Sequence, residues 1–161
     1  MAGKTGLSLK RLAGDRRGNV MLEFALAMPI LTLLLLGLLD LGRFSLQKSA
    51  MLQGAQEGAQ YGIQYPSDST GINSTAQNST ALTGVTATNS VFCECSAGTT
   101  ATCGTTCSGG GSPKKYVRVT ATKSFSSVLS VTTISFGSFG SWTPPTSVSA
   151  TVTLICASST C

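Results

Sequence analysis

A long apolar stretch near the N-terminus constrains the fold of this chain more than any other feature. Residues 24–39 contain a single polar side chain, that of Thr32. Residues 20–22 are also apolar and are separated from this stretch by Glu23. Together the two segments provide about the 20 residues that a helix needs to cross a membrane. The remaining chain is too small and too polar to bury such a helix on every side. The sequence therefore predicts a transmembrane helix over residues 19–41 rather than a core helix.

Basic residues lie on the N-terminal side of this stretch. Residues 1–18 carry a net charge of +4 out of the chain's total of +5. Cations that flank a membrane helix favour the cytoplasmic side, and only Arg43 and Lys48 follow the stretch closely. We therefore expect a cytoplasmic N-terminus and an exported C-terminal part. The basic residues belong to an N-terminal arm and not to a folded domain, which argues against nucleic acid as a partner.

The chain offers few groups for catalysis. It has no His and six acidic residues, and no two of these acids lie close together in sequence. General acid–base catalysis relies mostly on His and on carboxylates. We therefore expect neither an enzymatic activity nor a cofactor.

All the cysteines follow the apolar stretch. They are Cys93, Cys95, Cys103, Cys107, Cys156 and Cys161. An even number of cysteines confined to an exported part of a chain indicates disulfides, although the spacing selects no particular pairing. The first four could instead hold zinc, which binds four thiolates tetrahedrally. Their imperfect spacing and the oxidising compartment favour disulfides, so we expect no metal.

Glu23 lies at the edge of the apolar stretch, where a carboxylate is costly and usually functional. Two arginines, Gly18 and four further residues precede it, and Phe24 follows. This arrangement resembles the processing site of prepilins, in which a prepilin peptidase cuts after the Gly. The resemblance implies a leader over residues 1–18, cleavage between Gly18 and Asn19, and a role of Glu23 and Phe24 in assembly. Glu23 would then neutralise the new amine of a neighbouring subunit, because a buried charge needs a partner.

A larger set of features resembles the TadE-like family of minor pilins, or pseudopilins, of tight-adherence (Tad) pilus systems. The set comprises the Glu23–Phe24 pair, Pro29, an acid three residues before Arg43, and the small residues around Glu57. It covers residues 16–62, and the cysteines are not part of the family pattern. The resemblance implies a single-pass protein of the bacterial inner membrane, with a periplasmic or extracellular C-terminal part, that takes part in pilus assembly and surface adhesion. Its implied partners are the membrane, a prepilin peptidase, other pilin-like subunits and the Tad assembly machinery.

An unprocessed, signal-anchored protein is the alternative interpretation. Such a protein would display the cysteine-containing domain to an external ligand, and Glu23 would be dispensable. An ordinary secretory signal is disfavoured, because it needs a shorter apolar core and a small-residue cleavage site, which residues 40–44 do not provide.

Glycines recur at every fourth position in the continuation of the helix over residues 42–64. They are Gly54, Gly58 and Gly62. Each costs about 1 kcal/mol relative to Ala inside a helix, so close packing must compensate, either on the exported domain or on another subunit. Pro66 ends the helix, and the many Ser, Thr, Asn and Gly residues predict a loop over residues 65–81.

Residues 82–161 are predicted to form a β-rich domain that contains the cysteines. Apolar and polar residues alternate over residues 85–91, 117–122 and 148–154, which indicates half-buried strands. Residues 128–136 are a weaker strand candidate, and the repeat at 135–140 indicates a loop. The predicted fold class is α+β, with a long hydrophobic N-terminal helix that extends into a small antiparallel sheet stabilised by disulfides.

Overall fold

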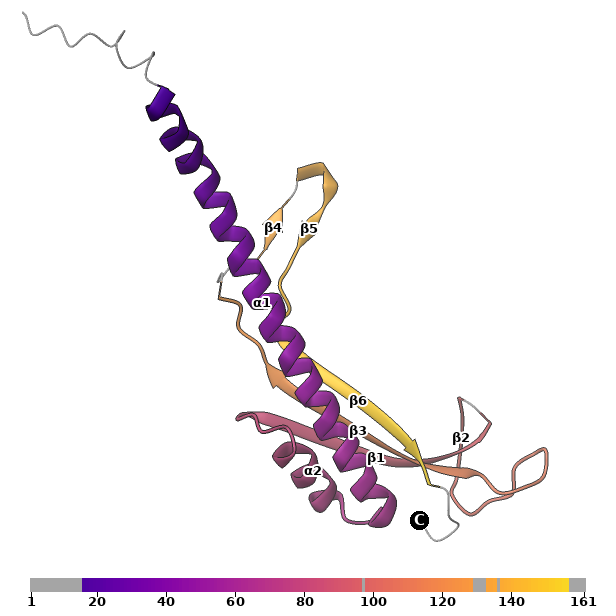
Figure 1. The fold of residues 1–161 in the computed structure, drawn as a ribbon. Coiled ribbons are helices and arrows are strands. Elements are labelled where there is room, and N and C mark those ends of the chain that lie inside the picture. Colours follow the sequence, from indigo (N-terminus) through magenta and orange to yellow (C-terminus); the bar gives the residue numbers. More distant parts are fainter. Residues whose placement is uncertain (1–15, 97, 129–132, 136, 157–161) are drawn as a thin grey trace, which may run out of the picture. The chain divides into compact units, whose positions relative to one another are not determined.

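The computed structural model describes residues 16–161, except 97, 129–132, 136 and 157–161 (Figure 1). The chain divides into two compact units, Met1–Asp40 and Leu41–Cys161. Its helices and strands, in chain order, are α1 (Arg16–Gln64), α2 (Ser69–Asn78), β1 (Val85–Ser96), β2 (Thr99–Ala101), β3 (Lys114–Ser124), β4 (Ile134–Ser135), a 3-10 turn (Gly137–Phe139), β5 (Ser141–Trp142) and β6 (Ser147–Ile155). This order confirms the predicted α+β fold, with a long apolar helix before a small antiparallel sheet.

In the first unit, helix α1 is apolar and exposed. Every side chain over residues 20–35 is exposed, and the helix is long and apolar enough to cross a membrane. Pro29 removes one backbone donor, yet α1 continues through it. The Thr32 hydroxyl donates to the Met28 carbonyl oxygen at 2.8 Å, so the one polar side chain of residues 24–39 is satisfied within the helix.

The second unit contains a four-stranded antiparallel sheet in the order β2-β1-β3-β6. The alternating residues on one face form the core, where Val117, Val119 and Val148 are fully buried. The second half of α1 and helix α2 lie on this face (Figure 1). The predicted strands are therefore present, because their period of two matches a sheet with one buried face.

The prediction of a loop over residues 65–81 was wrong, because most of this segment is helix α2. The Asp68 carboxylate caps the helix by accepting from the Gly71 N–H at 2.9 Å, and the Tyr61 hydroxyl donates to the same carboxylate at 2.8 Å. These two hydrogen bonds lower the pKa of Asp68. Ile72 and Ala76, one turn apart, are fully buried. The cap and the packing together outweigh the weak helix propensity of the Ser-, Thr- and Asn-rich segment.

The segment between β3 and β6 forms a second, two-stranded sheet. Ile134 pairs with Trp142 and Ser135 with Ser141, around the turn at Gly137–Phe139. Of the strand candidate at 128–136, the described strand is β4 alone, and residues 129–132 and 136 lie outside the described residues. The predicted loop at 135–140 is therefore the end of a tight hairpin.

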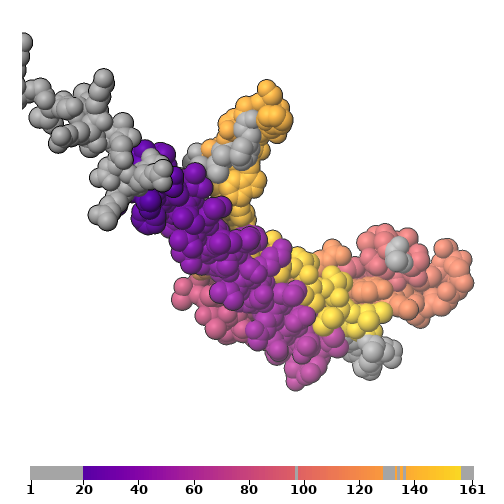
Figure 2. Space-filling model, turned by 45° about the horizontal axis from the view of Figure 1, so that its top comes forward, coloured from indigo at the N-terminus to yellow at the C-terminus, as the bar shows by residue number. Residues whose placement is uncertain are grey.

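Four cysteines form two disulfides that link the second half of β1 to the segment after β2. Disulfides join Cys93 to Cys103 and Cys95 to Cys107. Because these four sulfurs are in disulfides, they are not thiolates that could bind zinc. Cys156 is also disulfide-bonded, and Cys161 lies outside the described residues. The bridged segment projects from one end of the unit in the space-filling view (Figure 2). Its two bridges fix a Thr- and Gly-rich segment that offers little apolar surface of its own.

Candidate processing and assembly site

The predicted cleavage position lies in the first turn of α1. The helix begins at Arg16, so the peptide bond between Gly18 and Asn19 has helical backbone on both sides. Glu23 and Phe24 follow just over one turn later, and Phe24 is 58% exposed. Residue 19 precedes Glu23 by four positions on the same helix, which is about one turn.

The apolar surface that follows Glu23 is exposed on every side of the helix. Leu26, Ile30 and Leu34 on one face are each at least 60% exposed, and so are Leu35 and Leu39 on the opposite face. Soluble monomers rarely expose contiguous apolar surface of this extent. The helix is therefore suited to a lipid environment or to a bundle of similar helices.

The glycine strip lies in the second unit, where it is buried. A Cβ added to Gly54 would overlap the Ala76 carbonyl oxygen and the Thr80 methyl group. At Gly58 it would lie 2.7 Å from the Ala76 Cβ, and at Gly62 it would lie 2.7 Å from Val117 Cγ1. The strip thus packs against α2 and β3 of the same chain. Of the two packing alternatives considered for the strip, this geometry fits the one within the domain.

Residues 18–60 match the family model described as TadE-like protein. This N-terminal part of the chain is TadE-like. The match confirms the family resemblance, which was based on residues 16–62, and it supports a pilin-like role associated with the Tad pilus. No curated protein and no solved structure is significantly similar to the chain.

The TadE-like segment begins at Gly18 and includes Glu23, Phe24 and the whole apolar stretch. It ends at residue 60, before Gly62, α2 and the sheet. The residues predicted to serve processing and assembly therefore all lie within the matched segment. The six cysteines all lie outside it, in the part of the chain that no comparison matches.

One cluster on the face of the sheet away from the helices escaped the sequence analysis. The Phe92 and Tyr116 rings, on paired residues of β1 and β3, stack at 5.6 Å between centroids. The Arg118 guanidinium lies 4.6 Å from the Phe92 centroid, and its Nε donates to the Thr153 hydroxyl at 3.2 Å. The period of two places Tyr116 and Arg118 on one face, a signal that was available in the sequence. Phe92 joins them through the register of β1 and β3, which the sequence alone does not show. The cluster covers part of an otherwise Thr- and Ser-rich surface.

Proposed function

We propose that this chain is a minor pilin, or pseudopilin, of a Tad-type pilus. A prepilin peptidase removes residues 1–18, and the mature chain begins at Asn19. Residues 19–41 span the bacterial inner membrane with the N-terminus in the cytoplasm, and residues 42–161, α2 included, form the exported domain. The observation that carries this proposal is the TadE-like match, which starts at Gly18 and runs along an exposed apolar helix.

Assembly uses the same helix surface. When subunits leave the membrane for a filament, their apolar helices replace lipid contacts with contacts to other pilin-like subunits. The Asn19 amine and the Glu23 carboxylate then lie in an apolar bundle, where each charge is tolerable only if it is paired. Glu23 therefore fixes the register between subunits. The exported domain, with its disulfide-braced end, is carried to the surface of the pilus by the Tad assembly machinery and contributes to adhesion.

Glu23→Gln is expected to separate insertion from assembly. The variant should insert and lose its leader like the unmodified chain, because the helix and Gly18 are unchanged. Its recovery in sheared filaments should fall at least about tenfold, since breaking a buried charge pair costs about 3–5 kcal/mol. Immunoblots of the sheared and membrane fractions measure both effects.

Glu57→Gln is the matched control, because Glu57 is an exposed acid on the same helix. It should leave recovery unchanged. Normal recovery of Glu23→Gln in filaments would contradict the assembly role of Glu23. Absence of the unmodified chain from filaments would instead favour the signal-anchored protein.

A further inference from the structure

The hairpin of β4 and β5 exposes aromatic side chains in an uncharged region of the chain. Phe139 is 96% exposed, more than any other large apolar side chain that the structure describes, and Trp142 is 51% exposed. Residues 124–161 contain no Asp, Glu, Lys or Arg. The hairpin projects from its unit in the space-filling view (Figure 2). Exposed aromatic rings in a stretch of sequence without charged residues are suited to contact with an apolar or interfacial environment.

The hairpin belongs to the segment between β3 and β6. The two ends of this segment lie beside the part of α1 that follows the apolar stretch. The Phe125 N–H donates to the Thr146 carbonyl oxygen at 2.8 Å and so joins the two ends of the segment, which form its base. The Phe125 ring packs edge-on against Phe44 at 5.4 Å between centroids. The Arg43 guanidinium lies 5.9 Å from the centre of the same ring. The hairpin therefore leaves the domain at the end where α1 enters it.

This position brings the hairpin within reach of the membrane that α1 is proposed to cross. Phe44 follows Asp40 by four residues, which is about 6 Å along a helix axis. The arm from Thr146 back to Trp142 can extend over about 13 Å, at roughly 3.3 Å per residue. The length of the arm thus exceeds the distance from its base to the end of the apolar stretch.

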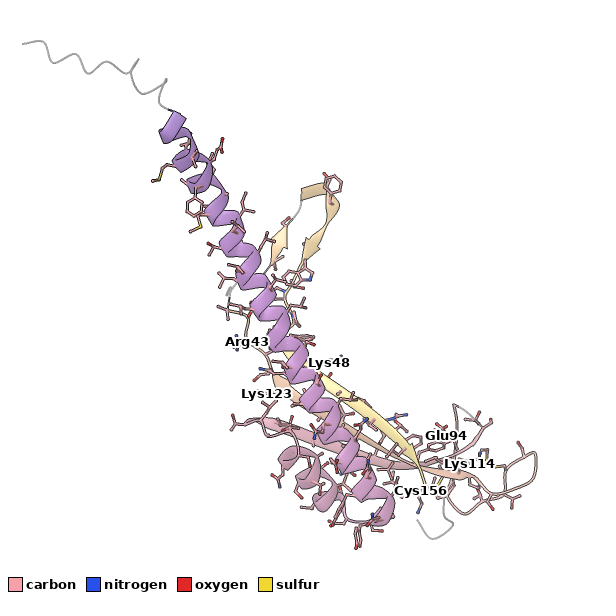
Figure 3. The ribbon with its side chains drawn as sticks, viewed as in Figure 1. Arg43, Lys48, Glu94, Lys114, Lys123 and Cys156 are labelled. Carbon is pink, nitrogen blue, oxygen red and sulfur yellow. A yellow bond between two sulfur atoms is a disulfide. The ribbon has the colours of Figure 1, made fainter. Side chains whose placement is uncertain are left out.

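The chemistry of the region fits a lipid interface. Trp is enriched where a membrane meets water, because its ring combines an apolar body with a polar N–H. Three cations lie near the base of this segment, namely Arg43 and Lys48 on α1 and Lys123 two residues before Phe125 (Figure 3). The Lys123 Nζ also donates to the Thr83 carbonyl oxygen. Anionic lipid headgroups attract such cations. The uncharged tip and the basic surroundings of its base are complementary to acyl chains and headgroups, respectively.

We propose that residues 137–142 insert into the outer interface of the membrane that α1 crosses. Phe139 and Trp142 lie at the boundary between acyl chains and headgroups, and Arg43, Lys48 and Lys123 face anionic headgroups. The exported domain is then held to the membrane at two points, α1 and the hairpin, and the hairpin must withdraw when the subunit is extracted. This inference rests on the proposed membrane insertion of α1 and is independent of leader cleavage and of filament assembly.

Trp142 is the single Trp of the chain, so its fluorescence reports on the hairpin directly. The full chain is placed at one copy per nanodisc of phosphatidylcholine and phosphatidylglycerol, which prevents contact with a second copy. Quenching is measured with brominated lipids and with acrylamide in the water phase. The control combines Trp142→Phe with Tyr65→Trp, which places the reporter at a 55% exposed position about 30 Å along the α1 axis from Phe44. Trp142 should be quenched by bromolipid and be at least about threefold less accessible to acrylamide than the control Trp.

Phe139→Asp should lower the bromolipid quenching of Trp142 at least about twofold, because an aspartate strongly opposes membrane burial. Phe139→Tyr, which keeps an interfacial aromatic ring, should preserve it. Equal acrylamide accessibility of Trp142 and the control Trp would overturn the inference, and so would protection from acrylamide without bromolipid quenching. Resistance to carbonate extraction, measured on the same samples, reports separately on the insertion of α1. Release of the chain from the membrane by carbonate would overturn both the membrane insertion of α1 and the contact of the hairpin with lipid.

Discussion

Gly54→Ala and Gly42→Ala are expected to change the stability of the sheet-containing unit in opposite directions. Both substitutions replace a glycine of α1 by a better helix former. A Cβ on Gly42 meets no atom within 4 Å, so Gly42→Ala should stabilise by up to about 1 kcal/mol. A Cβ on Gly54 would overlap the Ala76 carbonyl oxygen and the Thr80 methyl group. Helix α2 must then move, and we expect a net loss of about 1–3 kcal/mol.

Urea unfolding of the full chain in mild detergent, followed by far-ultraviolet circular dichroism, measures both changes. The comparison of two Gly→Ala variants on one helix removes the contribution of helix propensity. A Gly54→Ala variant as stable as Gly42→Ala would show that α2 does not pack on the glycine strip. The strip would then be available for contacts between subunits.

Removal of either described disulfide is expected to cost about 3 kcal/mol of unfolding free energy, since each closes a loop of roughly a dozen residues. The sequence separations are 10 for Cys93–Cys103 and 12 for Cys95–Cys107. The paired change Cys93→Ser with Cys103→Ser should cost more than Cys95→Ser with Cys107→Ser. The reason is that Cys93 is only 3% exposed, and a buried hydroxyl without a partner adds a further penalty.

Thr106→Ala is the control for the disulfide variants, because Thr106 is exposed in the same segment and its loss should change stability by less than about 0.5 kcal/mol. Urea unfolding measures the stabilities, and mass spectrometry after thiol alkylation verifies the remaining bridges. Unchanged stability of both paired variants would contradict a structural role of the bridges. A loss of stability on treatment with a chelator would revive the zinc interpretation.

The parts of the fold that follow from local pattern could be predicted. The apolar stretch predicted the exposed part of α1, since hydrophobicity over about 20 residues specifies a membrane helix. The alternation around Val117 and Val148 predicted β3 and β6, because one buried sheet face imposes a period of two. The motif from Gly18 to Phe24 predicted the start of the TadE-like segment.

The parts that depend on tertiary contacts could not be predicted. Helix α2 consists largely of Ser, Thr, Asn and Gly, and its stability comes from the Asp68 cap and from burial of Ile72 and Ala76 against α1. The spacing of Ile72 and Ala76 after an Asp was the available signal. The cysteine pairing depends on β1 and β2 being neighbours in the sheet, with Cys93 opposite Ala101. The position of the aromatic hairpin depends on the contact between Phe125 and Phe44, which are far apart in sequence.

The N-terminal residue of the membrane-inserted chain tests the central claim most directly. Intact mass spectrometry would determine it after expression with and without a prepilin peptidase. The pilin interpretation predicts a chain that begins at Asn19 when the peptidase is present and retains residues 1–18 when it is absent. A chain that keeps its leader under both conditions would contradict processing at Gly18 and would favour a signal-anchored protein.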